Sequence, residues 1–283
     1  MTTTEEINQR REEDLQRIRD FRLLDDDFMT KCFEGAPECV ELVLRIVLNK
    51  PDLKVVDVHT QVFVANLLKR SVRLDVLAVD SEGRMYNIEI QRDEKGAGMK
   101  RARFNNSLMD AKWTEKGTKF DDLPENYVIF VTETDVLGKG RALYRFGLCD
   151  LDDGEPADAG FHILYVNGER QENTPLGKLM HDFFCTNASD MHYEPLAKRV
   201  KFFKESKEGV EIMCKSMEEL WNKGVQEGIQ KGIREGETQN AIENAKRMLT
   251  DGALSLEKIA EYSGLALEKV LALHKEMEPQ TVS

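Results

Sequence analysis

Two adjacent segments, RLDVLAVD and RMYNIEIQ, carry the residues whose types and spacing could do chemistry. Both are rich in apolar and β-branched residues, and the short stretch SEG lies between them, which predicts two strands joined in a hairpin. If the loop has three residues, counting outward places Asp75 opposite Glu89 and Arg73 opposite Gln91. Directly opposed residues have β-carbons about 4.5–5.5 Å apart. The hairpin therefore brings two carboxylates together near its open end.

The surroundings of this carboxylate pair limit its chemistry. The remaining hairpin residues, from Leu74 to Val79 and at Ile88 and Ile90, are apolar on both faces, which predicts a hairpin in the middle of a sheet. Two opposed carboxylates are unfavourable there, unless one is protonated with a raised pKa or a divalent cation lies between them. Oxygen ligands favour Mg²⁺, or Mn²⁺ as its substitute, over zinc, and Mg²⁺ commonly also binds a substrate phosphate. The pattern predicts metal-assisted hydrolysis of phosphodiester bonds.

Further elements must position the hairpin. Apolar residues from Val40 to Leu48 follow helical spacing, and LKVVDVHTQVFV predicts a strand before the hairpin. Residues 97–115 predict a helix, and NYVIFVTE is a continuous apolar run typical of a buried strand. Two more strands are expected at ALYRFGL and FHILYVNG. This order of helices and strands predicts an α/β fold.

The sequence after residue 174 predicts helices only. We expect helices at residues 175–184, 195–221 and 221–249, followed by a small helical cap near the end. The long helix has a glycine every fourth residue from Gly224 to Gly236, beside Val225, Ile229 and Ile233. Each glycine costs about 1 kcal/mol relative to alanine in a helix, so close approach of another helix is the natural compensation. This helix is predicted to mediate homo-oligomerisation or docking; the alternative is a flexible linker.

Composition excludes several classes of protein. The 283 residues are 41% hydrophobic and 33% charged, which is typical of a globular protein. Their formal net charge of −12 argues against a protein that coats nucleic acid in general. The five cysteines form no C-x-x-C pair, and the histidines lack the spacing of a known metal motif, so we expect neither a disulfide framework nor a metal role for the histidines. Without a signal peptide or a long apolar run, the protein is expected to be cytoplasmic, with no membrane partner.

The ordered blocks resemble a known family. LLDDDFMTKCFEG, SVRLDVLAVDSEGRMYNIEIQR and RARFNNSLMDAKWTEKGTKFDDLPENYVIFVTE are similar to the PD-(D/E)XK nuclease superfamily, specifically its Rpn branch of recombination-promoting nucleases and transposases. The resemblance implies a restriction-endonuclease-like three-layer core, with a central mixed sheet between helices and a helical C-terminal extension. It also implies that Asp75, Glu89 and the backbone carbonyl of Ile90 bind Mg²⁺. Gln91 stands where the wider superfamily has lysine, and would orient the attacking water.

Other candidates follow from the resemblance and from local charge. Asp27 matches an aspartate of the family, in DFMTKCF, and either contacts the metal or caps the helix that follows. Since Gln91 carries no charge, Arg73, Arg92 or Lys95 is expected to supply a cation. Residues 92–119 contain eight basic and four acidic side chains, and we expect DNA phosphates to meet this stretch. The predicted DNA-binding residues are Arg73, Arg92, Lys95, Lys100, Arg101 and Arg103.

These expectations define three regions and one function. Residues 1–27 are a charged arm or helix, residues 28–190 the nuclease-like domain, and residues 191–283 a helical C-terminal region. The expected function is a Mg²⁺-dependent DNA endonuclease linked to recombination or transposition. The alternative is a catalytically inactive nuclease-like protein that acts as a DNA-associated or self-associating module.

Overall fold

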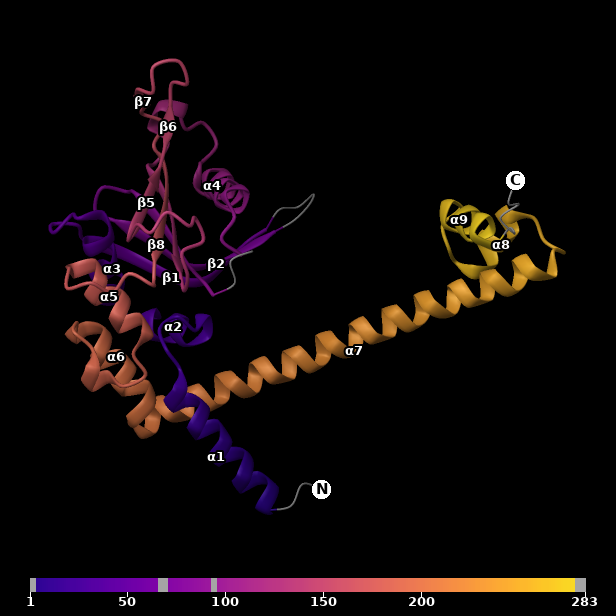
Figure 1. The fold of residues 1–283 in the computed structure, drawn as a ribbon, viewed down its shortest axis with the longest axis horizontal. Helices are drawn as coiled ribbons and strands as arrows, with labels where there is room; N and C mark the ends of the chain where they lie inside the picture. The colour runs from indigo at the N-terminus through magenta and orange to yellow at the C-terminus, as the bar shows by residue number, and fades with distance from the viewer. Residues whose placement is uncertain (1–3, 66–70, 93–95, 278–283) are drawn as a thin grey trace. The chain divides into compact units, whose positions relative to one another are not determined.

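A computed structural model of the chain describes residues 4–65, 71–92 and 96–277 (Figure 1). The chain divides into two compact units, Met1–Cys214 and Lys215–Ser283. Lys95, one of the predicted DNA-binding residues, lies outside the described residues. Each unit is described by itself below.

The first unit is built on a mixed six-stranded sheet in the order β1-β2-β3-β4-β8-β5. β1, β2 and β3 pair antiparallel, β3, β4 and β8 pair parallel, and β5 pairs antiparallel with β8 at the edge. A small second sheet contains β6 and β7. The strands are β1 (Val55–Val64), β2 (Val72–Asp80), β3 (Met85–Gln91), β4 (Asn126–Thr132), β5 (Leu143–Phe146), β6 (Leu148–Cys149), β7 (Pro156–Ala157) and β8 (Phe161–Asn167).

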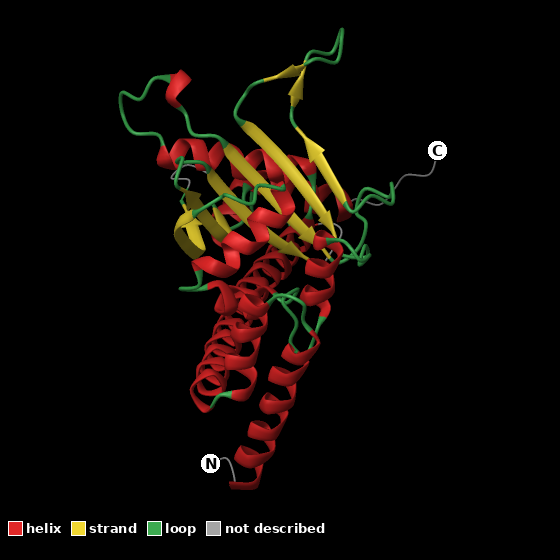
Figure 2. Cartoon of the chain, turned by 90° about the vertical axis from the view of Figure 1, so that its left-hand side faces the viewer, coloured by secondary structure: helices red, strands yellow, loops and turns green. Residues whose placement is uncertain are grey.

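Helices lie on both sides of this sheet (Figures 1 and 2). α4 (Met99–Trp113) buries Ala102 and Met109 against a core that includes Leu77, Val128 and Phe130. α2 (Asp26–Phe33) and α3 (Pro37–Leu48) pack on β1 and β2, with α5 (Pro175–Phe184) and α6 (Glu194–Glu205) next to them. The remaining helical elements of the unit are α1 (Thr4–Asp20) and the short 3₁₀ turns η2 (Phe120–Asp122) and η3 (Ala188–Asp190). The predicted mixed sheet between helices is confirmed.

The turn between β2 and β3 fixes the register of the hairpin. Val79 pairs with Met85 and Val76 pairs with Ile88, which confirms the register predicted from a three-residue loop. Gly83 has a φ of 79°, the left-handed conformation that a three-residue hairpin loop requires at this position. The strands therefore continue toward Asp75 and Glu89 in the predicted alignment.

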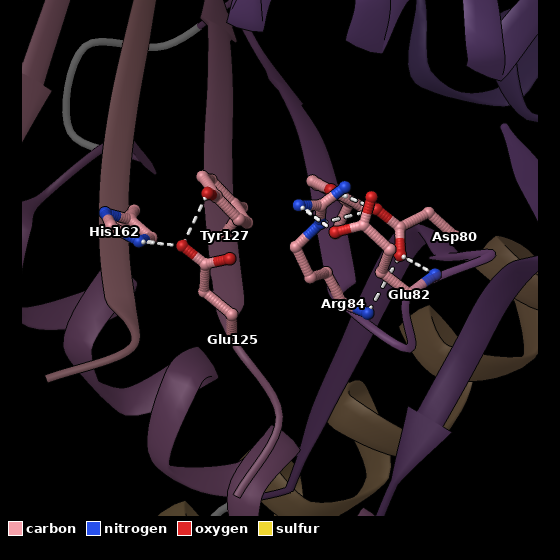
Figure 3. Close-up of polar contacts among 7 residues, drawn as sticks. Asp80, Glu82, Arg84, Glu125, Tyr127 and His162 are labelled. Carbon is pink, nitrogen blue, oxygen red and sulfur yellow. Dashed lines mark hydrogen bonds and ion pairs between the residues drawn. The ribbon is translucent and has the colours of Figure 1, made fainter. Parts of the chain in front are cut away.

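Asp80 stabilises this turn through both carboxylate oxygens (Figure 3). Its Oδ1 accepts hydrogen bonds from the backbone N–H groups of Glu82 and Arg84, at 2.9 and 3.0 Å. Its Oδ2 accepts from Arg84 Nε and from the Tyr86 hydroxyl, both at 2.7 Å. Burial opposes ionisation of Asp80, yet these hydrogen bonds lower the pKa of Asp80 below its usual value. The turn is thus held by a buried, ionised carboxylate.

The helical end of the chain differs from the expected boundaries. Instead of helices over 195–221 and 221–249, α6 ends at Glu205 and α7 (Lys207–Asp251) runs without a break. The break lies at Ser206, whose hydroxyl accepts the backbone N–H of Gly209 at 2.9 Å. A β-carbon at Gly209 would overlap the backbone of Phe202. The corner between the two helices therefore depends on a hydroxyl cap and a residue without a side chain.

The second unit is small and helical. The end of α7 packs with α8 (Leu256–Ser263) and α9 (Leu267–Met277) around a core of Ala245, Ile259, Val270 and Leu273. The sequence analysis assigned residues 191–283 to the helical region, whereas the structure includes α6 in the first unit, where it packs on α2 and α3. Within the described part of the chain, no helix combines the length and apolar character needed to cross a bilayer.

Candidate active site

Asp75 and Glu89 lie at the end of the hairpin remote from the turn. The last ladder pair is Val76 with Ile88, so Asp75 and Glu89 occupy the next opposed positions. The strands remain close there, because the backbone N–H of Ile90 donates to Asp75 Oδ2 at 3.1 Å. Both side chains are buried, with exposed fractions of 7% for Asp75 and 0% for Glu89. The structure thus brings together the two carboxylates that the sequence placed opposite each other.

Glu89 is held on both of its oxygens. Asn87 Nδ2 donates to Oε1 at 3.1 Å, and Arg101 Nη2 donates to Oε2 at 2.8 Å. Asn87 and Glu89 share one face of β3 because side chains alternate along a strand, and Arg101 reaches that face from the first turn of α4. The ion pair fixes the orientation of Glu89 and ties α4 to β3.

Burial raises the pKa of both carboxyls. Desolvation, followed by the charges of Glu89 and Asp26, raises the pKa of Asp75 to about 8. Desolvation also raises the pKa of Glu89, although Arg101 and Asn87 oppose that shift. A cation beside the pair would favour the ionised forms. Raised carboxyl pKa values at one sheet end are characteristic of functional sites.

A third carboxylate, Asp26, acts on this pair. Its charge raises the pKa values of both Asp75 and Glu89. Asp26 is an exposed residue at the start of α2, and Gln61 Nε2 donates to Asp26 Oδ1 at 3.4 Å and to Thr30 Oγ1 at 3.0 Å. Gln61 has a φ of 53° within β1. Gln61 therefore links β1 to the first turns of α2.

Asp26 is a further candidate from this segment, next to Asp27. Asp27 was predicted either to contact the metal or to cap the helix. The N-cap position of α2 belongs to Asp25, whose Oδ2 accepts the backbone N–H of Arg22 at 2.7 Å, so the capping interpretation was wrong. The charge that acts on Asp75 and Glu89 is that of Asp26. Three consecutive aspartates could not be distinguished from sequence, because one residue turns a helix by 100°.

Gln91 is fitted against Gly96. A β-carbon built at Gly96 would overlap the side-chain carbonyl oxygen of Gln91. The backbone carbonyl of Gly96 accepts a hydrogen bond from Arg101 Nη1 at 3.2 Å, so the same arginine contacts both Gly96 and Glu89. Gly96 therefore allows Gln91, Glu89 and Arg101 to gather at one end of β3.

The backbone of Ile90 points toward the same edge as Asp75. In an extended strand the N–H and C=O of one residue point in the same direction. The Ile90 N–H reaches Asp75, whereas the carbonyl of Gln91 accepts from the N–H of Glu133, beyond the end of β4. The carbonyl of Ile90 is thus directed to the β2 side of β3.

The predicted DNA-binding residues have different surroundings. Arg101 was expected to meet phosphate but pairs with Glu89, and Arg92 pairs with Asp25 at 2.6 Å and with Glu133 at 2.9 Å. Partial burial and the charge of Asp27 raise the pKa of Asp26, and the exposed Arg73 opposes this rise. The side chains of Lys100 and Arg103 are exposed on α4. Among these predicted residues, Arg101 is the cation that the structure places against Glu89.

The available ligands fit a hard divalent cation. Asp75, Glu89, Asp26 and the Ile90 carbonyl supply oxygen atoms, which Mg²⁺ and Mn²⁺ prefer. The exposed position of Asp26 suits an ion that keeps part of its water shell. Beside Glu89, the buried Oδ1 of Asn87 has no hydrogen-bond partner among the described residues, so the surroundings retain unused acceptor capacity.

Comparison with known proteins identifies the family. Residues 46–234, which include Asp75, Glu89, Gln91 and Arg101, match the family described as PD-(D/E)XK nuclease family transposase. The chain belongs to this family. The PD-(D/E)XK nuclease family transposase region begins in α3 and ends in α7, so it contains the whole sheet but not Asp26. No match was found among curated proteins or among solved structures.

Membership of the PD-(D/E)XK nuclease family transposases confirms the resemblance stated from the sequence. The six-stranded mixed sheet flanked by helices is an α/β restriction-endonuclease-like fold. The family supports a nuclease-related or transposase-related role, and its nucleases generally use divalent metals. The two carboxylates on adjacent strands, Asp75 and Glu89, lie within the matched region.

Proposed function

We propose that this protein is a Mg²⁺-dependent DNA endonuclease whose site contains Asp75, Glu89 and Gln91. The observation that carries the proposal is the pair of buried carboxyls with raised pKa values at the end of β2 and β3. Such a pair destabilises the protein unless a proton or a cation compensates it. Buried carboxyls with raised pKa values are characteristic of sites where the carboxyls do chemistry.

Each residue has a distinct role in this proposal. Asp75, Glu89 and the Ile90 carbonyl hold the metal. Asp26 contacts the metal either directly or through a water molecule. The bound ion supplies Lewis acidity to a phosphate and lowers the pKa of its water. Gln91 orients the attacking water through its amide. Arg101 holds Glu89 in place and supplies the positive charge that Gln91 lacks.

DNA is the expected substrate, because the family is one of nucleases. The exposed cations Lys100 and Arg103 on α4 are close in sequence to Arg101 and are the best candidates for phosphate contacts. Arg73 is a further candidate beside Asp26. Contacts of this kind position a strand without reading its sequence. The proposed biological setting, recombination or transposition, follows from the family alone.

Self-association is proposed through α7. Val225, Ile229 and Ile233 are exposed on this helix, and a β-carbon at any of the glycines at positions 224, 228, 232 and 236 would meet no described atom within 4 Å. Apolar residues and glycines on one exposed helix suit a second helix at short distance. We therefore propose that a second copy of α7 covers this surface.

The test of the nuclease is cleavage of supercoiled plasmid by the full chain. Wild type, Glu89→Gln and the matched control Glu115→Gln, at an exposed glutamate after α4, are compared in Mg²⁺, Mn²⁺ and EDTA. We expect nicking or linearisation by wild type and control with metal only, and a loss of at least about 100-fold in Glu89→Gln. Absence of cleavage by the wild type with either metal would favour the inactive, self-associating module. Equal cleavage by all three proteins would show that Glu89 is outside the site.

A further inference from the structure

A second cluster of metal-binding side chains lies where α5 ends. His181 lies in the last turn of α5, and Cys185, four residues later, is the C-cap residue directly after the helix. His181 Nδ1 is 3.5 Å from Cys185 Sγ and 3.5 Å from Asp182 Oδ1. Among the described residues, these three form the one group of histidine, cysteine and acidic ligands close enough to share an ion.

Both distances are close to those expected for a shared tetrahedral metal, and the distance between His181 and Asp182 is long for a direct hydrogen bond. With Zn–N and Zn–O near 2.05–2.1 Å and Zn–S near 2.3 Å, tetrahedral angles give ligand separations of about 3.6 Å for N and S and about 3.4 Å for N and O. The observed value of 3.5 Å between His181 and Asp182 is long for a hydrogen bond, for which about 2.9 Å is usual. The separations of His181 Nδ1 from Cys185 Sγ and from Asp182 Oδ1 are therefore already close to those of a tetrahedral zinc site.

The structure also orients this group. Asp182 is fully buried, and its two oxygens accept the backbone N–H groups of His192 and Tyr193 at 2.7 and 2.8 Å. Hydrogen bonds that fix a ligating carboxylate are a regular feature of protein metal sites. They also bring His192 back to α5, where its ring lies 4.8 Å from the ring of His181 between centroids. His192 thus lies next to the group, and its ring has to turn toward His181, Asp182 and Cys185 to give a fourth ligand, because only those three residues have ligand atoms within 4.8 Å of one another.

We propose that His181, Asp182, Cys185 and His192 form a structural Zn²⁺ site, separate from the carboxylate pair at Asp75 and Glu89. Thiolate and imidazole ligands select zinc over magnesium, whereas the all-oxygen site has the opposite preference. The sequence analysis expected no metal role for these histidines, because H-x-x-x-C followed by a histidine matches no common motif. The fold brings the four residues together across the connection between α5 and α6.

The proposed zinc site supports the chain segment that precedes Asp26. The carbonyl of Phe183, within the last turn of α5, accepts the backbone N–H of Leu24 at 3.3 Å. Lys204 Nζ donates to the carbonyls of Thr186 and Arg19, at 2.6 and 2.8 Å, and to that of Phe21. Zinc at this point would hold the 181–193 segment in the conformation that makes these contacts.

Cobalt substitution tests the proposal on the full chain. Co²⁺ in a tetrahedral site with a thiolate gives intense visible bands and a near-ultraviolet sulfur-to-metal charge-transfer band, which carboxylate sites do not give. We expect one equivalent of Co²⁺ to produce both bands, and Zn²⁺ to abolish them. Glu89→Gln should retain the bands, since the carboxylate pair is a separate site.

Matched cysteine variants identify the ligand. Cys185→Ser should lose the charge-transfer band, while Cys149→Ser, at an exposed cysteine in β6, should keep it. If Cys185→Ser does not fold, His192→Gln at an exposed histidine should lower Co²⁺ affinity at least tenfold. Zinc at about 100 times its dissociation constant should raise the Tm of wild type by roughly 5 °C, with no such shift in the folded ligand variants. A wild type without the charge-transfer band, or a Cys185→Ser variant that keeps it, would overturn the proposal.

Discussion

Asp75 and Glu89 combine a chemical use with a cost to stability. Each is almost completely buried, and the pKa of each is raised by desolvation. Glu89 has a partner in Arg101, whereas Asp75 has a backbone N–H and repulsion from two other carboxylates. Asp75 therefore bears most of the unfavourable charge when no metal is bound.

Asp75→Asn should stabilise the protein in EDTA at alkaline pH. The folded pKa of Asp75, about 8, exceeds an unfolded value of about 3.9, so the folded state binds more protons between these limits. The contribution of Asp75 to stability is therefore greatest below pH 4 and falls as pH rises to about 8. Asparagine keeps an acceptor for the Ile90 N–H and has no such dependence.

Urea denaturation of both proteins in EDTA from pH 5 to pH 9 measures this difference. We expect the variant to exceed the wild type by at least about 1 kcal/mol at pH 8, with a smaller gain at pH 5. Added Mg²⁺ should stabilise the wild type and leave the variant nearly unchanged. A variant that is less stable than wild type at pH 8 in EDTA would contradict the raised pKa of Asp75.

Gly96→Ala should reduce cleavage without unfolding the protein. The new β-carbon would displace the side-chain carbonyl of Gln91. The Gln91 side chain is flexible enough to move, but it would then leave its place beside Glu89 and Arg101. Gly98→Ala is the matched control, since a β-carbon there meets no described atom within 4 Å. We expect a drop of about tenfold or more in plasmid cleavage for Gly96→Ala alone, with Tm changes of only a few degrees. Equal activity in the two variants would remove Gln91 from the site.

At the level of elements, the hairpin turn determines which residues meet. Asp80 accepts four hydrogen bonds, from two backbone N–H groups, Arg84 and Tyr86, and its side chain is only 1% exposed. A slip of one residue would send every side chain of β2 to the opposite face. The carboxylate pair depends on a turn located at the other end of the same strands.

Asp80→Asn should lower stability by about 2–4 kcal/mol at pH 7, because Arg84 loses a buried charged partner. The hydrogen bonds hold the folded pKa of Asp80 below its unfolded value. The stability they give is therefore present above about pH 4 and is lost as pH falls through the folded pKa. The difference between the two proteins should shrink below pH 4 in urea denaturation. Glu82→Gln, at a side chain that is 68% exposed, should cost less than about 0.5 kcal/mol.

Sequence patterns predicted the strands better than the helical end. Strands β2, β3, β4 and β8 and helix α5 lie where β-branched runs or helical spacing indicated. A long helix over residues 221–249 was predicted, but the start of α7 at Lys207 was not, because the break at Ser206 depends on a hydroxyl cap and on the close approach of Gly209 to Phe202. The opposed positions of Asp75 and Glu89 were predicted because they depend on strand register. The place of Asp26 and the pairing of Arg101 with Glu89 were not predicted, because they depend on tertiary packing.

For the whole molecule, the exposed apolar residues of α7 bear on assembly. Ile229 and Ile233 are 58% and 55% exposed, which is unusual for isoleucines in a helix unless a partner covers them. Ile229→Lys with Ile233→Lys should convert an oligomer into a monomer, because two buried lysines per helix would repel each other. Light scattering after size-exclusion chromatography measures the mass. A monomeric wild type at micromolar concentration would contradict the proposed α7 contact.

The control for that experiment keeps the charge change and moves it away from the apolar residues. Gln226→Lys with Gln230→Lys adds the same charge to α7 at exposed polar positions. This control should retain the mass of the wild type. Loss of the oligomer in both double variants would point to net charge rather than to a specific apolar contact.

The three-residue turn also has a consequence for the order in which the chain folds. Pairing β2 with β3 closes a very short loop, whereas pairing β3 with β4 must wait for the whole α4 crossover to be brought into place. The hairpin is therefore expected to form early, at a stage when α4 has not yet delivered Arg101. Asp75 and Glu89 would then lie opposite each other in a partly folded chain, without the charge of Arg101 nearby. Repulsion between the two carboxylates would therefore slow the folding of the chain.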